Sequence, residues 1–394
     1  QYLFLPLIQI SEITGFWGVS ALVVFPSAYL GNAIKEKVAD LRSFIDGHRI
    51  ELYLYAGILA FSLIFGFLVQ RDYQGQPRWR VALVQHNADS WEGGVRTFRR
   101  NLEILTDLSR QSLSEDPDIV IWSETAFVPG VDWHTKYRTD ADRYQLVARF
   151  REFMQEMEVP VLTGNDDGQL ADPNLPPVLP NGEMNRVDYN AVLLYHENEL
   201  KRTYRKTHLV PFTEHFPYEE QLPGLHRLLV ENDYHFWEKG DEYTVFDVDG
   251  VKFSTPICFE DVFGYISRRF VNEGAEVIVN MTNDSWSGSV AAQMQHFAMA
   301  VFRAIENRRS LVRGTNSGMT SVIDPDGRIL YMMEPFVRGY AVEEVPIYTE
   351  RTTLYTKWGN WFPWTALVLS TLLLIGGGLF HLYFKSRAPR GRGH

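Results

Sequence analysis

Three residues in the middle of the chain carry the side chains that covalent acyl chemistry needs, and the first is a thiol. Cys258 is the single cysteine among 394 residues, so it can form no internal disulfide and no cysteine-built metal site. It ends the apolar run VKFSTPIC (251–258), which is followed by a helix-like segment reaching Gly274. A thiol at a strand-to-helix junction faces the positive end of a helix, which favours the thiolate. The alternative is an inert buried cysteine.

A carboxylate and an ammonium group follow two other apolar runs. Glu124 comes directly after DIVIWS (118–123). A carboxylate at the end of a buried strand must be paired or have a raised pKa, and either condition suits a general base. The alternative is a helix N-cap or a solvated strand end. Lys206 lies in TYRKTHLVPF, where it could stabilise an oxyanion; the alternative is a surface lysine in a basic cluster with Lys201.

The segments around these residues predict an α/β layered domain over residues 79–345, because short β-rich runs alternate with amphipathic ones. A loop rich in Pro, Asn and Gly is expected from Asp166 to Gly182, and a DPDG turn should close a hairpin at 324–327. The expected strands include 80–85, 118–122, 159–164, 189–196, 251–258 and 275–282, and the expected helices are 95–111, 142–158, 261–274 and 291–309.

Composition limits the class of protein. With 45% hydrophobic and 22% charged residues the chain is neither disordered nor a disulfide-stapled miniprotein. A formal net charge of −11 makes a nucleic-acid-binding surface unexpected. The sequence contains no HExxH, no Gly-rich phosphate loop and no clustered Cys and His, so we expect neither a metal nor an organic cofactor.

Both ends of the chain contain apolar runs long enough to cross a bilayer, at about 13–30, 52–69 and 362–384. The alternative is a set of buried core helices. Basic residues fill the loop 31–49 and the tail 385–394, so the positive-inside rule predicts both to be cytoplasmic and the middle domain to lie outside. Arg71 lies just after the second span, on the predicted outer side, and so conflicts with this orientation. We give it less weight than the short loop and the tail, because long translocated domains obey the rule poorly. Because the chain begins with Gln1 and an apolar stretch, we expect further spans to precede it.

Four blocks of sequence, in order, resemble the signatures of the nitrilase (carbon–nitrogen hydrolase) superfamily: IWSETA, YRKTHLVPFTEHFP, TPICFEDVF and NMTNDSWSG. The resemblance covers residues 79–345 and implies an α-β-β-α sandwich with a Glu–Lys–Cys triad. It implies that Glu124 is the base, that Lys206 stabilises the oxyanion and that Cys258 is the nucleophile.

Together with the flanking spans, further blocks resemble the apolipoprotein N-acyltransferase family: QISEITGFWGVSALVV, MQHFAMAVFRAIENRR, RGTNSGMTSVID and TLYTKWGNW. This resemblance implies a multi-pass enzyme of the bacterial inner membrane with a periplasmic catalytic domain. Its partners would be a phospholipid acyl donor and a diacylglyceryl lipoprotein acceptor. The acyl chain would pass through a cysteine thioester to the α-amino group of the lipoprotein's S-diacylglyceryl-cysteine.

The same resemblance extends to five more residues. It implies that Glu214 and Glu260 are acidic residues needed near the triad, and that Phe259 contributes a backbone N–H to the oxyanion. Trp91 would lie on a mobile arm at the substrate entrance and Trp286 would line the pocket, although core packing is an equal alternative for both tryptophans.

Two rival functions stay open on the sequence. One is a membrane-tethered amidase that uses the same triad, which would turn over a water-soluble amide without detergent. The other is an inactive membrane scaffold that retains the fold, against which the intact triad residues argue.

Overall fold

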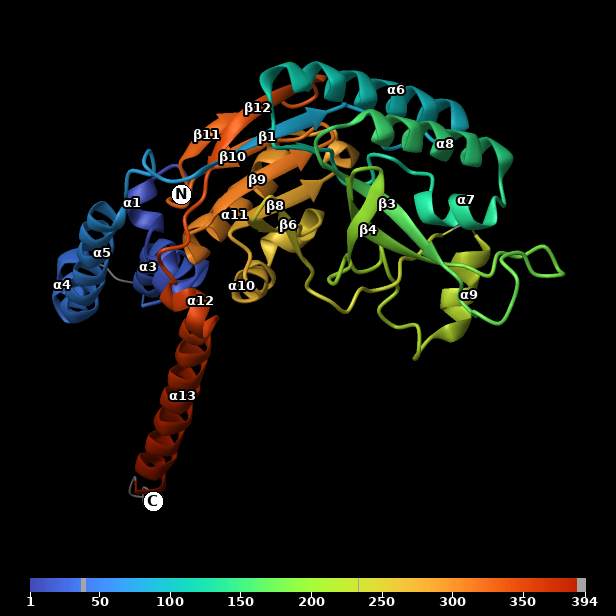
Figure 1. Cartoon of the computed structure of the whole chain (residues 1–394). Helices are drawn as coiled ribbons and strands as arrows, with labels where there is room; N and C mark the ends of the chain where they lie inside the picture. The colour runs from blue at the N-terminus through green and yellow to red at the C-terminus, as the bar shows by residue number, and fades with distance from the viewer. Residues whose placement is uncertain (37–39, 233, 388–394) are drawn as a thin grey trace.

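The computed structural model describes residues 1–36, 40–232 and 234–387. Part of the predicted basic tail, residues 388–394, lies outside the described residues, as does Lys37 of the predicted loop. Two six-stranded sheets form the middle of the molecule (Figure 1). The first has the order β12 (Gly339–Pro346), β1 (Arg78–Gln85), β2 (Ile119–Ile121), β3 (Val161–Gln169), β4 (Val187–His196), β5 (Glu199–Arg205). The second has the order β11 (Ile329–Met332), β10 (Ser321–Ile323), β9 (Ser310–Thr315), β8 (Val277–Thr282), β7 (Val251–Ser254), β6 (Val245–Val248).

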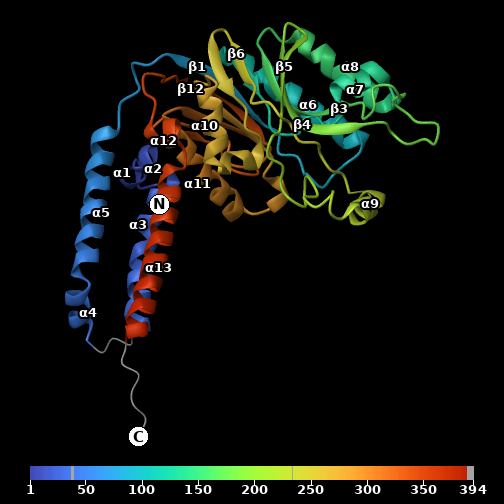
Figure 2. The same cartoon turned by 90° about the horizontal axis from the view of Figure 1, so that it is seen from below.

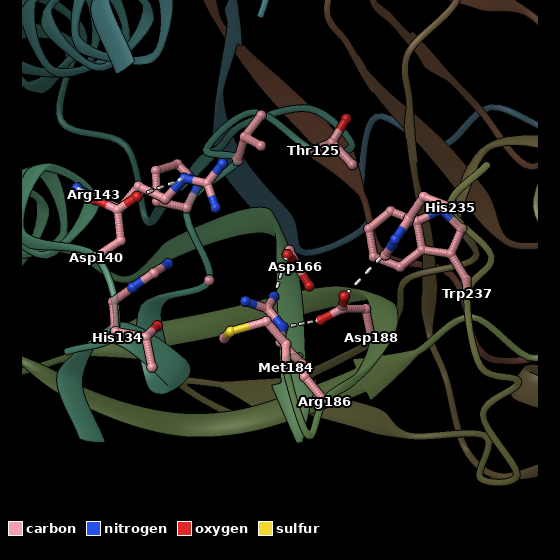
Figure 3. A pocket seen from close by; sticks show the side chains of 14 residues that line it. Thr125, His134, Asp140, Arg143, Asp166, Met184, Arg186, Asp188, His235 and Trp237 are labelled. Carbon is pink, nitrogen blue, oxygen red and sulfur yellow. Dashed lines mark hydrogen bonds and ion pairs between the residues drawn. The ribbon is translucent and has the colours of Figure 1, made fainter. Parts of the chain in front are cut away.

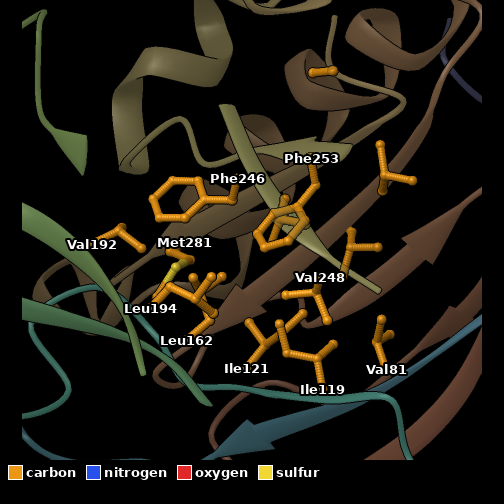
Figure 4. Close-up of a cluster of buried hydrophobic side chains, with 14 of the residues drawn as sticks. Val81, Ile119, Ile121, Leu162, Val192, Leu194, Phe246, Val248, Phe253 and Met281 are labelled. Atoms are coloured by element: carbon orange, nitrogen blue, oxygen red, sulfur yellow. The ribbon is translucent and has the colours of Figure 1, made fainter. Parts of the chain in front are cut away.

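The two sheets pack face to face because their buried strands are apolar on both sides. In β1, Val81 and Leu83 point into the core between the sheets, whereas Ala82 and Val84 point to the opposite face. This is the two-residue alternation of a strand. Figure 4 shows the core between the sheets, with side chains such as Leu194 of one sheet near Met281 of the other.

Helices cover the outer faces of both sheets. α6 (Val95–Ser112) and α8 (Ala141–Glu156) pack on the first sheet, and α11 (Val290–Asn307) packs on the second with α10 (Gly264–Asn272) beside it (Figure 1). The order of layers is therefore helix, sheet, sheet, helix, which confirms the expected α-β-β-α sandwich. The shorter helices of this domain are α7 (Val131–Tyr137) and α9 (Pro223–Glu231).

The centre of each sheet is parallel, and this fixes where the site can form. β1, β2 and β3 run parallel in one sheet, and β7, β8 and β9 run parallel in the other. Residues that follow the carboxyl ends of parallel strands meet at one edge of a sheet. Glu124 follows β2, Cys258 follows β7 and Asn283 follows β8.

Several predicted boundaries are wrong. β3 continues through Asp166 to Gln169, where a loop was expected, because its polar residues pair with Val187–Asn190 of β4. The strand expected at 251–258 ends at Ser254. The helix expected from residue 261 begins at Gly264, and a short 3₁₀ turn, η2 (Cys258–Val262), stands in between.

Within the described residues, three helices are long and apolar enough to cross a membrane: α3 (Phe16–Lys35), α5 (Arg49–Val69) and the Trp361–Leu379 part of α13 (Trp361–Arg387). The first span starts later than predicted because Gly15, with φ of +65°, separates it from α2 (Ser11–Thr14). Figure 2 shows the three helices extending from the same side of the sandwich, with α4 (Leu41–Gly47) at the far end.

Buried polar contacts fasten these helices to the sandwich. Glu12 of α2 pairs with Arg308, whose guanidinium Nε lies 2.6 Å from the Glu12 carboxylate. The backbone N–H of Phe16 donates to Glu306 at 2.9 Å, and the indole N–H of Trp361 donates to the carbonyl of Ile13 at 2.7 Å. α2 and α3 are therefore tied directly to the sandwich, and α13 is tied to α2. The remaining short helices of this region are α1 (Leu5–Ile8) and α12 (Leu354–Trp358).

Candidate active site

The structure brings Glu124, Lys206 and Cys258 together at one end of the strands. Lys206 directly follows β5, and its Nζ lies 3.5 Å from Oε1 of Glu124. Cys258 is the third member, because the charges of both groups act on its thiol: Glu124 raises the pKa of the thiol and Lys206 lowers it. Base, cation and thiol thus form one contiguous set drawn from both sheets.

Lys206 is fully buried, which excludes the alternative of a surface lysine. Its ammonium donates to Oε1 of Glu214 at 2.7 Å, so two carboxylates share one buried cation. Burial alone would lower the pKa of Lys206, but the carboxylate of Glu124 and the carboxylate of Glu214, which also accepts a hydrogen bond from the ammonium, raise it above its usual value. Lys206 is therefore a permanent cation, which is the state that stabilises an oxyanion.

Glu124 is held by two residues that the sequence analysis did not single out. Asn190 donates from Nδ2 to Oε1 of Glu124 at 2.8 Å, and the backbone N–H of Asn283 donates to Oε2 at 2.9 Å. Asn190 stands inside the apolar strand β4, and a lone amide in such a strand is the signal that would have found it. Burial raises the pKa of Glu124, and the charge of Lys206 opposes that rise. A carboxyl of raised pKa is a stronger base once ionised.

Cys258 has a φ of +50°, a left-handed conformation that costs a non-glycine residue about 1–3 kcal/mol. This backbone conformation turns the chain sharply at the thiol. The predicted preference for the thiolate is wrong, because no long helix begins at Cys258. Burial raises the pKa of the thiol well above its usual value, and Glu124 raises it further while Lys206 lowers it. Cys258 is a thiol at rest and needs a base to ionise it.

Glu260 holds the turn of Cys258 against the segment after Lys206. Its fully buried carboxylate accepts from the backbone N–H groups of Thr207 at 2.8 Å, His208 at 2.9 Å and Ile257 at 2.7 Å. The hydroxyl of Tyr204 donates to it as well, at 2.9 Å. Glu260 thus positions the backbone on both sides of the site.

Both singled-out tryptophans lie at the surface, so the core-packing alternative does not hold. Trp91 is 79% exposed and Trp286 is 60% exposed. Their loops touch, because Oγ of Ser90 donates to Oδ1 of Asn283 at 3.0 Å. Phe259 is partly buried, with its ring edge-to-face against another phenylalanine ring at 5.1 Å.

A cavity of about 740 Å³ is lined in part by Thr125, the residue after Glu124. Figure 3 shows Arg186 in its wall between Asp166 and Asp188, with the Arg186–Asp166 ion pair at 2.5 Å. A second cavity of about 570 Å³ is lined by residues 207–209 and 234–239. Cys258 lines neither of them, so they flank the triad rather than contain it.

Comparisons with known proteins identify the family of the chain. The carbon-nitrogen hydrolase family model matches residues 80–353. Apolipoprotein N-acyltransferase 1 of Treponema denticola is 42% identical over 388 residues, covering 95% of this chain and 70% of that protein. Its namesake from Treponema pallidum is 42% identical over 397 residues, covering 97% and 72%. Among solved structures, Nit3 of Saccharomyces cerevisiae is 18% identical with a TM-score of 0.46, covering 70% of this chain and 92% of that one. The chain belongs to the carbon–nitrogen hydrolase family and, within it, to the apolipoprotein N-acyltransferases.

Proposed function

We propose that this membrane protein moves a fatty acyl chain from a phospholipid, through a thioester on Cys258, to the N-terminal amino group of S-diacylglyceryl-cysteine in a lipoprotein. One observation carries the proposal: a buried ammonium, Lys206, lies between the carboxylates of Glu124 and Glu214, and the charges of Lys206 and Glu124 both act on the thiol of Cys258. The names of the relatives and the three apolar helices support lipid-anchored substrates.

In the first half-reaction, Glu124 accepts the thiol proton while the sulfur of Cys258 bonds to the ester carbonyl carbon of the phospholipid. The oxyanion that forms is stabilised by Lys206 and by the backbone N–H of Phe259. When the ester C–O bond breaks, the departing lysophospholipid oxygen takes the proton from Glu124. The enzyme keeps the acyl chain as a thioester.

In the second half-reaction, the amine of the acceptor attacks the thioester carbon, and Glu124 takes one of its protons. The C–S bond breaks, and the thiolate of Cys258 recovers that proton as the amide is released. The oxyanion meets the same donors in both steps. Removing one such donor costs about 2.7–4 kcal/mol of barrier, or roughly 10²–10³ in kcat.

The proposed location is the bacterial inner membrane, with the catalytic domain in the periplasm. Lys35 at the end of α3, Arg42 in α4 and Arg49 at the start of α5 all belong to the connection farthest from the sandwich (Figure 2). Basic residues in short loops favour the cytoplasmic side. The exposed rings of Trp91 and Trp286 are the proposed apolar border of the entrance for acyl chains.

The proposal is tested with purified protein in detergent, a phospholipid and a synthetic S-diacylglyceryl-cysteinyl peptide, with mass spectrometry of the peptide as the readout. Lys206→Ala should lower kcat about 10²–10³-fold. Lys201→Ala is the matched control, because it removes an exposed lysine paired only with the surface residues Glu197 and Glu199, and it should leave kcat unchanged. A wild-type kcat in Lys206→Ala would overturn the proposal. If the wild-type protein releases ammonia from a soluble amide and does not acylate the peptide, the amidase alternative is favoured.

A further inference from the structure

Next to the turn of Cys258 lies a buried set of four charged side chains, which we call the quartet: Asp261, Asp284, His296 and Arg313. The imidazole of His296 lies 2.8 Å from Asp261 through Nε2 and 2.8 Å from Asp284 through Nδ1. Arg313 of β9 contacts the same two carboxylates, at 3.4 Å in the case of Asp284. Both aspartates and Arg313 are almost completely buried.

The two aspartates belong to different parts of the candidate active site. Asp261 is in η2, the 3₁₀ turn that Cys258 begins. Asp284 directly follows Asn283, whose backbone N–H donates to Glu124. His296, from α11, is therefore a bridge between the turn of the thiol and the strand end that holds the base.

Charge in the quartet balances only when His296 is protonated. Both ring nitrogens face carboxylate oxygens, so both must carry a proton to donate. Burial lowers the pKa of His296, but the charge of Asp261 and the hydrogen bonds to Asp261 and Asp284 outweigh this and raise it to about 9, although Arg313 opposes them. With His296 and Arg313 positive, two cations meet two carboxylates.

Other polar groups around the quartet do not replace this charge. The hydroxyl of Thr282 donates to the carboxylate of Asp284 at 3.2 Å. The side-chain amide of Gln293, on α11, donates to the backbone carbonyl of Asp284 at 3.4 Å. Arg303, also on α11, donates to the carbonyl of Val262 at 2.6 Å and pairs with Glu306 instead of with Asp284. His296 and Arg313 are thus the cations that contact Asp284 among the described residues.

The carboxylate of Asp284 also acts on the nucleophile, because its charge raises the pKa of the Cys258 thiol. We propose that protonated His296 is a positioning residue for Cys258: it ties the turn of the thiol to the Asn283 segment and offsets the charge of Asp284, which acts on the thiol. The inference rests on the proposed function only in taking Cys258 as the nucleophile.

The test uses the intact chain in detergent and follows alkylation of its thiol by iodoacetamide as a function of pH, by intact mass. Because Cys258 is the single cysteine, one added group reports one site. His296→Gln should lower the alkylation rate at pH 8 about three- to tenfold and move the midpoint of the profile upward, since a smaller fraction of the thiol is ionised. Adding Asp284→Asn should move the midpoint back down.

Arg308→Gln is the control for a merely structural effect. It breaks a comparable buried ion pair with Glu12 and Asp326 at the opposite end of α11, so it should lower the melting temperature and leave the midpoint unchanged. An unmoved midpoint in His296→Gln would overturn the inference. If that variant does not fold, Asp284→Asn alone decides: its midpoint should fall, and an unmoved midpoint would again overturn the inference. The alkylation assay contains no lipid, so it is independent of acyl transfer. If the midpoint shifts as expected but the protein transfers no acyl chain in the separate lipid assay, the proposed function fails and this inference stands.

Discussion

Replacing Glu260 by alanine should destabilise the catalytic domain strongly, because this carboxylate accepts hydrogen bonds from two segments of chain that are distant in sequence. Its loss would leave the buried N–H groups of Thr207, His208 and Ile257 without their acceptor. Removing one side of a buried charged network costs about 3–5 kcal/mol. The total stability of a domain is about 5–15 kcal/mol, so this loss is a large share of it.

The measurement is the melting temperature of the purified chain in detergent, followed by tryptophan fluorescence. A domain of this size loses roughly 2 °C for each kcal/mol, so Glu260→Ala should melt about 6–10 °C lower. Glu260→Gln should also melt lower, because its amide group would face a backbone N–H. Glu273→Ala, at the exposed end of α10, is the matched control and should stay within about 1 °C. A shift below about 2 °C in Glu260→Ala would refute the view that this carboxylate holds the two sides of the site together.

Three further outcomes follow from the buried charges. Glu214→Gln removes one charge-assisted partner of Lys206, worth about 1.5–3 kcal/mol, so single-turnover acyl loading should slow by about one to two orders of magnitude; an unchanged rate would contradict the role of Glu214. Burial raises the pKa of Glu124, so loading should fall as the pH drops towards that raised value, because the protonated acid cannot accept the thiol proton; a rate that stays flat from about pH 8 to about pH 4 would argue against Glu124 as the base. Glu12→Gln breaks a buried pair with Arg308 and should lower stability by about 3–5 kcal/mol in a thermal melt while thiol alkylation keeps its pH midpoint; a shifted midpoint would show that the attachment of the spans also sets the thiol.

The sheets could be predicted from sequence where strands are buried on both faces. Runs such as 119–122 are continuously apolar, and a helix of the same length would need a polar side. The end of β3 escaped prediction because Asp166 and Asp167 are polar, and only their pairing with β4 makes them a strand. Pairing partners distant in sequence leave no local pattern.

The candidate site was less visible because burial decides its chemistry. Lys206 follows exposed basic residues, yet it is buried like Tyr204, which lies two positions before it at the end of β5. That two-residue spacing was the available signal. His296 stands one residue before Phe297 on the apolar face of α11, and an ionisable group on such a face indicates a buried partner. The acidity of Cys258 was misjudged because the helix begins six residues after the thiol, at Gly264.

The most direct test of the central claim is the intact mass of the protein after incubation with phospholipid and no acceptor. We predict one added acyl group, removed by neutral hydroxylamine and absent in Cys258→Ala. An acyl group that survives hydroxylamine, or one that forms in Cys258→Ala, would contradict a thioester on this cysteine.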